Sequence, residues 1–307
     1  MKTFLNRRSF LHIGGGTLAL AALAPAALRA ADEAAPQKKR SIKKAIMGGT
    51  IAVKGSLLEK YKLVKEAGFE GVEPDSHGDD QEQVLAALEA TGLKAASVCC
   101  GTHWHLTLSH PSEAMREKGL DGLKQAIRRA GVYGATSVLL VPGTVGSGVS
   151  YEQCWQRSIE QIRKAIPLAE ETGVTISIEN VWNDFITKED EAVRYLDEIN
   201  SPFVKWHFDI GNIIHYGDPI EWVKKLGQRI GRLHLKEFSR DLAMKNNKRG
   251  DGFRAKFLEG ANNWPGIMKA LDDAGYDGVW GIAEQGGGGT AEGLKDLAQR
   301  MDKIFAS

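Results

Sequence analysis

From Lys43 onward the sequence alternates short apolar runs with longer amphipathic segments, and this alternation constrains the fold more than any other feature. Strands are predicted at 44–48, 68–74, 93–100, 137–142, 174–179, 205–209, 232–236 and 279–284. Helices are predicted at 57–67, 81–91, 112–133, 151–172, 188–199, 219–226, 263–274 and 291–305. Eight strand–helix units favour a parallel sheet that closes into a single (β/α)8 TIM barrel.

An open, doubly wound α/β sheet is the alternative fold. It is weaker because the segment after the first strand, Met47 to Val53, holds two glycines but no G-x-G-x-x-G fingerprint of dinucleotide binding. The folded body, residues 43–307, has the length of one barrel of roughly 250 residues. We therefore expect one domain.

The first thirty residues read as a twin-arginine export signal, because Asn6 to Leu11 (NRRSFL) precedes an apolar stretch from Gly14 to Ala27. That stretch is too short for a transmembrane helix of about 20 residues, so no stable membrane anchor is expected. A cleavage site is expected near Ala30, followed by a disordered spacer over 31–42. The mature protein would then be periplasmic or extracellular.

Charge and cysteine content exclude some functions. The whole chain has a net charge of +1; residues 1–30 hold four basic residues and no acidic one, so the rest carries −3. Such a balance disfavours nucleic acid as a partner. Cys99, Cys100 and Cys154 form no paired framework. Cys99 and Cys100 are predicted to be small buried side chains rather than nucleophiles.

Polar side chains alternate with apolar ones along three of the later strands, and the polar set ends in metal-ligating residues. Because successive residues of a strand face opposite sides, each polar set shares one face. Glu284 ends an apolar run without such alternation, so strand parity gives the least support for placing its side chain with the others. The polar sets are Thr175, Ser177 and Glu179; Lys205, His207 and Asp209; and Arg232, His234 and Lys236.

Glu179, Asp209, His234 and Glu284 are the candidate metal ligands. Three carboxylates and one imidazole suit Mn²⁺ best, with Mg²⁺, Co²⁺ and Zn²⁺ as alternatives. Buried together without a cation, the carboxylates would repel one another at a cost of several kcal/mol. The alternative is that each is a solvated charge at a strand end.

From Lys43 to Phe305 the chain resembles the xylose-isomerase-like TIM barrels, which include sugar phosphate isomerase/epimerases, ketose 3-epimerases and hydroxypyruvate isomerases. The resemblance implies a divalent cation on the same four residues. It also implies that Glu179 and Glu284 exchange a proton next to a sugar carbonyl through an enediolate. The resemblance is seen in the segments 68–73 (GFEGVE), 178–180 (IEN), 208–212 (FDIGN), 233–237 (LHLKE), 264–271 (WPGIMKAL) and 275–278 (GYDG).

The sequence departs from the family pattern beside the metal residues. Asn212 stands where ketose 3-epimerases commonly have His, and Glu237 stands where Asp is usual. The resemblance is therefore to sugar isomerases and epimerases in general. Candidate substrate-binding residues are His103, His105, Trp182, His207, Asn212, Lys236 and Arg240.

Two loops and two further functions complete the expectations. Residues 249–256 form a long loop that suggests a lid or a specificity loop, and Gly286 to Gly289 are read as a flexible loop rather than a phosphate cradle.

A lyase acting on 3-oxo-glycosides through the same four residues is the second functional hypothesis, and a non-catalytic carbohydrate-binding barrel is the third. The partner is a small carbohydrate; a homo-oligomer is left open.

Overall fold

A computed structural model describes residues 40–245 and 247–307. Its nine strands form one parallel sheet with the order β3-β2-β1-β9-β8-β7-β6-β5-β4. The strands are β1 (Lys43–Met47), β2 (Gly71–Glu73), β3 (Lys94–Ala95), β4 (Val98–Cys99), β5 (Ser137–Leu140), β6 (Thr175–Glu179), β7 (Val204–Asp209), β8 (Ile230–Leu235) and β9 (Trp280–Ala283).

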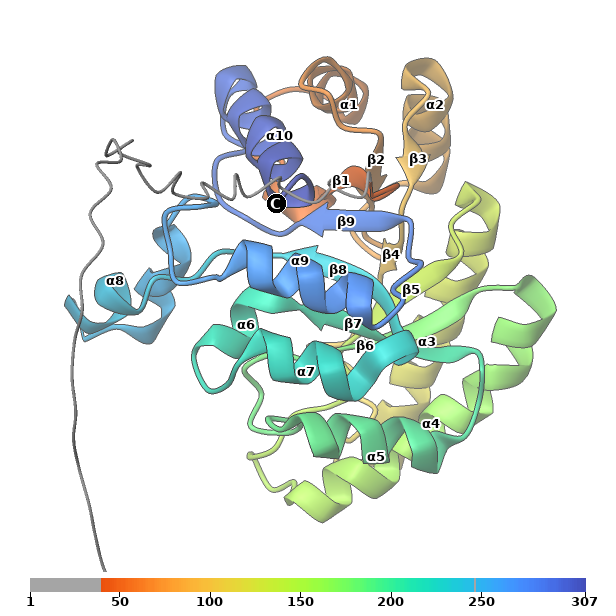
Figure 1. Ribbon diagram of the computed structural model, residues 1–307. Coiled ribbons are helices and arrows are strands. Elements are labelled where there is room, and N and C mark those ends of the chain that lie inside the picture. The colour runs from red at the N-terminus through yellow and green to blue at the C-terminus, as the bar shows by residue number, and fades with distance from the viewer. Residues whose placement is uncertain (1–39, 246) are drawn as a thin grey trace, which may run out of the picture. The chain divides into compact units, whose positions relative to one another are not determined.

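The two edges of this sheet are consecutive pieces of one strand. β3 and β4 both fall within the predicted strand 93–100, and β3 pairs with β2 whereas β4 pairs with β5. An isolated parallel bridge between Asp75 and Cys99 joins the continuation of β2 to β4. The sheet thus curls into a nearly closed barrel with helices around it (Figure 1), which confirms the predicted fold class.

One long helix follows each strand position, as the sequence predicts. These helices are α1 (Leu57–Glu66), α2 (Gln81–Thr91), α3 (Glu113–Tyr133), α4 (Tyr151–Thr172), α5 (Glu189–Ile199), α7 (Pro219–Leu226), α9 (Trp264–Asp273) and α10 (Ala291–Phe305). Five short elements were not predicted: η1 (Gly48–Thr50), α6 (Ile210–Ile214), η2 (Gly227–Arg229), α8 (Arg240–Lys245) and η3 (Arg249–Arg254).

Local capping explains why the long helices begin and end where the sequence indicates. Ser56 and Ser150 each form a capping box with the residue three positions later, which satisfies free amide groups in the first turn. Gly134 and Gly173 end α3 and α4 in the left-handed conformation, with φ of 72° and 67°. Both termini of α4 are therefore set locally.

The inner face of β6 is polar, as the alternation predicts. Ser137 Oγ lies 2.8 Å from Ser177 Oγ across β5 and β6. On the other face of β6, Ile176 and Ile178 are fully buried in the apolar layer between sheet and helices. The polar inner face of β6 ends at the carboxyl ends of the strands, where active sites of such barrels lie.

The predicted export signal and most of the predicted spacer lie outside the described residues. Arg40, at the end of that spacer, is tied to the barrel: its guanidinium pairs with Asp272 at 3.0 Å and donates to the carbonyls of Phe305 and Ser307. None of the helices in the described part of the chain is long and apolar enough to cross a membrane.

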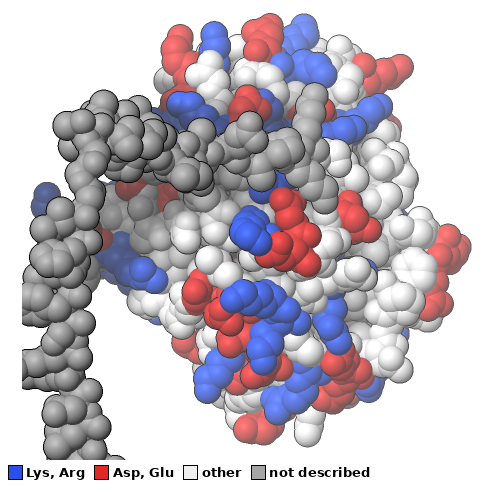
Figure 2. All heavy atoms as spheres, viewed as in Figure 1, with Lys and Arg blue, Asp and Glu red and all other residues white. Residues whose placement is uncertain are grey.

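Surface charge and cysteines agree with the expectations from composition. Acidic and basic side chains are interspersed over the face seen in Figure 2. Cys99, Cys100 and Cys154 are buried and form no disulfide. This confirms the predicted burial of Cys99 and Cys100.

Candidate active site

Four neighbouring strands each bring one candidate metal ligand to the barrel mouth. Glu179 ends β6, Asp209 ends β7, His234 is the last but one residue of β8, and Glu284 follows β9. One ligand atom of each side chain lies within 4.8 Å of those of the other three. The convergence predicted from strand parity is therefore present, and Glu284 joins it although its own strand shows no alternation.

His234 lies at the centre of this group. Its Nδ1 is 2.9 Å from Oε1 of Glu179 and 3.1 Å from Oε2 of Glu284. The side chain has no solvent exposure, whereas that of Glu284 keeps 23%. Glu284 is thus the member of the group that opens most to the cavity above it.

Lys236, two residues beyond His234, neutralises part of the charge. Its Nζ lies 2.7 Å from Oε1 of Glu284 and 3.2 Å from Oδ2 of Asp209. Because the same strand face carries His234 and Lys236, one strand supplies both the imidazole and the cation.

Two asparagines fix the end of β7. The Asn180 amide donates to the Asp209 carbonyl at 2.7 Å, and its Oδ1 accepts from the Asp209 amide at 3.1 Å. Oδ1 of Asp209 caps α6 by accepting from the Asn212 amide at 2.8 Å. Asn212 also donates to the Asn180 carbonyl, so the backbone around Asp209 is held from both sides.

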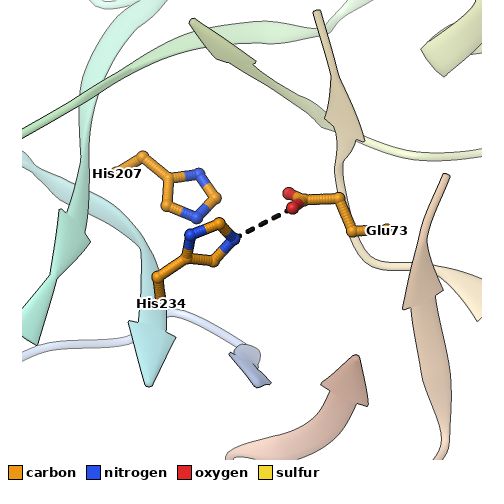
Figure 3. Close-up of side chains that lie close together, drawn as sticks. All are labelled: Glu73, His207 and His234. Atoms are coloured by element: carbon orange, nitrogen blue, oxygen red, sulfur yellow. Dashed lines mark hydrogen bonds and ion pairs between the residues drawn. The ribbon is translucent and has the colours of Figure 1, made fainter. Parts of the chain in front are cut away.

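Below the group, Glu73 and His207 form a second buried layer. His207 was predicted to bind substrate, whereas Glu73 was not assigned to the site from the sequence. Nε2 of His234 is 2.9 Å from Oε2 of Glu73, which reaches across from β2 (Figure 3). The His207 ring packs edge-on against His234, with centroids 4.2 Å apart. Glu73 ends one of the family-like segments, and that position was the one signal that could have identified it.

Burial and charge shift the pKa values of these groups in opposite directions. Burial raises the pKa of Glu179 and raises that of Asp209 to about 7, although His234 and Lys236, respectively, oppose the shift. Burial would also raise the pKa of Glu284, but Lys236 and His234 outweigh it and lower the value. Despite burial, the surrounding carboxylates raise the pKa values of His234 and Lys236.

This donor set fits a divalent cation. Oδ2 of Asp209 is fully buried and, among the described residues, has an ion pair with Lys236 but no hydrogen bond of normal geometry. Three carboxylates, only partly balanced by Lys236 and His234, surround that point. Oxygen-rich sites with one imidazole suit hard or borderline cations such as Mg²⁺ and Mn²⁺.

A cavity of about 260 Å³ opens directly above the group. Glu179, Lys236 and Glu284 form part of its lining. Its aromatic lining comprises Trp104, Trp182 and Phe253, and its other polar lining comprises His103 and Asn212. This volume is just below the usual range of small-molecule sites, about 300 to 1,000 Å³, so the cavity suits a small ligand.

The comparisons with known proteins identify the family. A family model described as a xylose isomerase-like TIM barrel matches residues 61–304. The chain belongs to this family. L-ribulose-5-phosphate 3-epimerase UlaE of Escherichia coli O157:H7 is 24% identical over 235 residues, which cover 73% of this chain and 80% of that protein.

Solved structures of other xylose isomerase-like barrels share the fold. A D-psicose 3-epimerase from Clostridium cellulolyticum H10, with D-tagatose, has a TM-score of 0.70 and 18% identity, covering 86% of this chain and 98% of that one. The apo 3-keto-D-glucoside 4-epimerase YcjR from E. coli has a TM-score of 0.69 and 18% identity over 86% and 98% of the two chains. At this identity the similarity establishes the fold.

Four predicted substrate-binding residues of this barrel line the cavity: His103, Trp182, Asn212 and Lys236. His103 accepts a hydrogen bond from the Val141 amide on Nδ1 at 3.1 Å, and burial lowers its pKa to about 4. The ring is therefore neutral at pH 7, and because Nδ1 accepts a hydrogen bond, its proton is on Nε2.

The other three predicted substrate-binding residues do not line the cavity. His207 has no exposed surface, because it lies two residues below the end of β7 and therefore about 7 Å deeper in the barrel. His105 is exposed in the loop turn that follows β4. Arg240 lines a separate surface cavity and donates to the Ile214 carbonyl at 3.0 Å.

The long loop after β8 forms part of the cavity wall through Phe253. The buried Glu237 carboxylate accepts from the amides of Leu258 and Asn262 and from the Trp264 indole, at 2.8, 3.2 and 2.8 Å. Gln285 donates to the carbonyls of Phe253 and Ala255. The Phe253 ring is thereby held beside Trp182, with centroids 4.8 Å apart.

Proposed function

We propose that this protein is a divalent-metal-dependent sugar isomerase or epimerase that removes a proton next to a carbonyl. The observation that carries the proposal is the placement of Glu179 and Glu284. Both carboxylates contact the same nitrogen of His234, although they come from strands separated in the sheet by β7 and β8. Both also line the cavity. The curated relative UlaE, a sugar 3-epimerase, supports the same class of reaction.

Glu179, Asp209, His234 and Glu284 would hold the cation, and Mn²⁺ is the ion we expect there. Bound to these residues, a divalent cation would stabilise the negative charge that develops on the sugar oxygens as the proton leaves. Elemental analysis of the purified protein tests this part. A stoichiometric divalent ion supports it, whereas a metal-free protein that also fails to take up Mn²⁺ would contradict it.

The protein's own groups carry the proton transfer. One of the two glutamates accepts the proton from the carbon beside the carbonyl, and the other returns a proton to the opposite face, which gives epimerisation. Return of the proton to the neighbouring carbon gives isomerisation. Lys236, which already contacts Glu284 at 2.7 Å, would donate a hydrogen bond to a sugar oxygen, and the aromatic walls would exclude water.

Deuterium uptake from D₂O tests the reaction itself. Metal-loaded protein is incubated with a panel of ketoses and 3-oxo-glycosides, and the sugars are analysed by mass spectrometry. Uptake without a leaving group supports the isomerase or epimerase. Uptake with release of an aglycone would point instead to the lyase, and no uptake across the panel would contradict both enzymatic hypotheses.

We also propose that the chain is exported by the twin-arginine route, on the basis of the segment at 6–11. A fusion of residues 1–42 to a reporter that is active only after export tests this. Replacing Arg7 and Arg8 by Lys should abolish export of the reporter. Export that persists in that variant would contradict the proposed route.

A further inference from the structure

The lining of the cavity provides no free cation for a phosphate group. Within the described part of the chain, Lys236 is the one lysine or arginine among the lining residues, and it is already paired with Asp209 and Glu284. His103 also lines the cavity, but it is neutral at pH 7. A phosphate there would lie near two carboxylates and would have no arginine or lysine of its own.

The loop after the last strand, which often binds phosphate in TIM barrels, contributes no glycine to the cavity lining. Its four glycines are Gly286 to Gly289. The Gly288 carbonyl instead accepts from the Ala52 amide at 2.8 Å, and a Cβ at Gly288 would lie 2.3 Å from the Thr50 carbonyl oxygen. The loop is packed against the segment that follows β1.

The basic residues of the loop after β8 do not supply the missing charge either. Arg254 pairs with Asp251, and Lys256 lies 3.9 Å from Asp296. Arg249 stacks on the Trp182 ring, with Cζ 4.4 Å from the centroid, but it is not among the lining residues. Its guanidinium packs on the ring of a lining residue.

The lining instead suits the C–H faces of an uncharged sugar. Trp104 and Trp182 are indoles, and Phe253 completes the aromatic set. Trp104 is 49% exposed, so part of its ring is available to a ligand at the rim. Aromatic rings of this kind bind the apolar faces of sugars, whereas the polar groups bind hydroxyl oxygens.

From these observations we infer that the site takes an unphosphorylated sugar and discriminates against the corresponding sugar phosphate, unlike the curated relative, which is an L-ribulose-5-phosphate 3-epimerase. The inference rests on the proposed function. It specifies the substrate class of the same site: a neutral ketose or keto-glycoside.

A competition experiment tests this inference. Mn²⁺-loaded protein receives equimolar mixtures of a ketose and its terminal phosphate in D₂O, for ribulose, xylulose, fructose and tagatose. The ratio of deuterium uptake gives the ratio of kcat/KM for the pair. We expect the neutral sugar of the best pair to be preferred by at least about ten-fold, which corresponds to about 1.4 kcal/mol.

Two variants and one control make the outcome specific. Arg249→Gln should leave the ratio of kcat/KM between neutral sugar and phosphate unchanged. The matched control Arg254→Gln, in the same loop, should leave it unchanged too. Trp182→Leu should reduce uptake into the neutral sugar by about ten-fold while the fold, checked by circular dichroism, is retained.

Each result decides between the claims. A preference for the phosphate, lost in Arg249→Gln but not in Arg254→Gln, would overturn the inference and leave the proposed function intact. An equal rate for both members of the best pair would also overturn it. No uptake into any sugar would overturn the proposed function and the inference with it.

Discussion

Nε2 of His234 lies 2.9 Å from Oε2 of Glu73, and both side chains are fully buried. This contact turns the other ring nitrogen, Nδ1, toward Glu179 and Glu284. A histidine that holds a metal is oriented in this way when a carboxylate accepts its second N–H. Glu73 is therefore a positioning residue for His234, contributed by a strand on the other side of the barrel.

Glu73→Gln should weaken metal binding. The amide no longer carries the negative charge that favours the N–H of His234, and the loss of such a partner typically costs 10- to 100-fold in metal affinity. Titration with Mn²⁺ by isothermal calorimetry measures the effect, with exposed Glu82→Gln as the matched control. Equal affinity in the wild type and in Glu73→Gln would contradict the assigned role.

Lys236→Met should destabilise the metal-free protein more than the metal-loaded one. Removing this cation leaves the buried carboxylates of Asp209 and Glu284 unbalanced, at a cost of about 3 kcal/mol or more. Bound Mn²⁺ supplies positive charge at the same place, so by linkage the variant should bind it more tightly. Urea unfolding with and without Mn²⁺ measures both free energies.

Lys205→Met, on β7 at the opposite end of the barrel interior, is the control for this experiment, because its Nζ donates to the Gln228 carbonyl rather than to a carboxylate of the site. Its effect on stability should not depend on Mn²⁺. If Lys236→Met lowered the free energy of unfolding equally with and without Mn²⁺, Lys236 and the ion would not neutralise the same carboxylates.

Glu237→Gln should loosen the wall that carries Phe253. The carboxylate accepts three backbone N–H groups, including those of Leu258 and Asn262, and one indole N–H. Hydrogen bonds to a charged group contribute about 1.5 to 3 kcal/mol each. Hydrogen exchange at the amides of Leu258 and Asn262 should accelerate by about ten-fold or more, whereas the strands stay protected. Exposed Glu259→Gln should leave both amides protected; unchanged exchange in Glu237→Gln would show that the loop is held by other contacts.

His103 should make stability depend on pH below neutrality. Its folded pKa of about 4 lies below the usual value of about 6.5, because burial disfavours the charged ring. Between these values the unfolded chain binds a proton that the folded chain does not, so the free energy of unfolding should fall as pH drops from 6.5 to 4. Above pH 7 this contribution is constant.

Urea unfolding at pH 7 and pH 5 measures this dependence. His103→Asn keeps an acceptor for the Val141 amide but removes the titration, so its stability should change less between the two pH values than that of the wild type. The exposed His77→Asn serves as the control and should behave like the wild type. A steeper fall in His103→Asn would contradict the assigned burial effect.

Local sequence signals were sufficient for the regular elements of the barrel. α2, α4, α7 and α10 begin and end where the sequence predicts, because capping residues and amphipathic periodicity are local properties. The short elements α8 and η3 were missed, since they depend on anchoring by Glu237 and Gln285 from elsewhere in the chain. Tertiary contacts of this kind leave no local pattern.

The active site, too, could be predicted from the sequence only in part. Alternation along the strands predicted which face His207 would take, but it could not give its depth, and the residue lies below the cavity instead of lining it. Glu73 approaches His234 across the barrel from a strand far away in the sequence. Parity along one strand cannot reveal such a contact, because it depends on how the sheet closes.

Metal-dependent deuterium uptake tests the central claim most directly. Protein loaded with Mn²⁺ is given the sugar that it labels best in D₂O, then stripped with a chelator, then reloaded. We predict uptake beside the carbonyl that stops on chelation, returns with Mn²⁺, and falls by about 10² to 10⁴-fold in Glu284→Gln. Uptake that continued unchanged after the metal was removed and in Glu284→Gln would contradict the account.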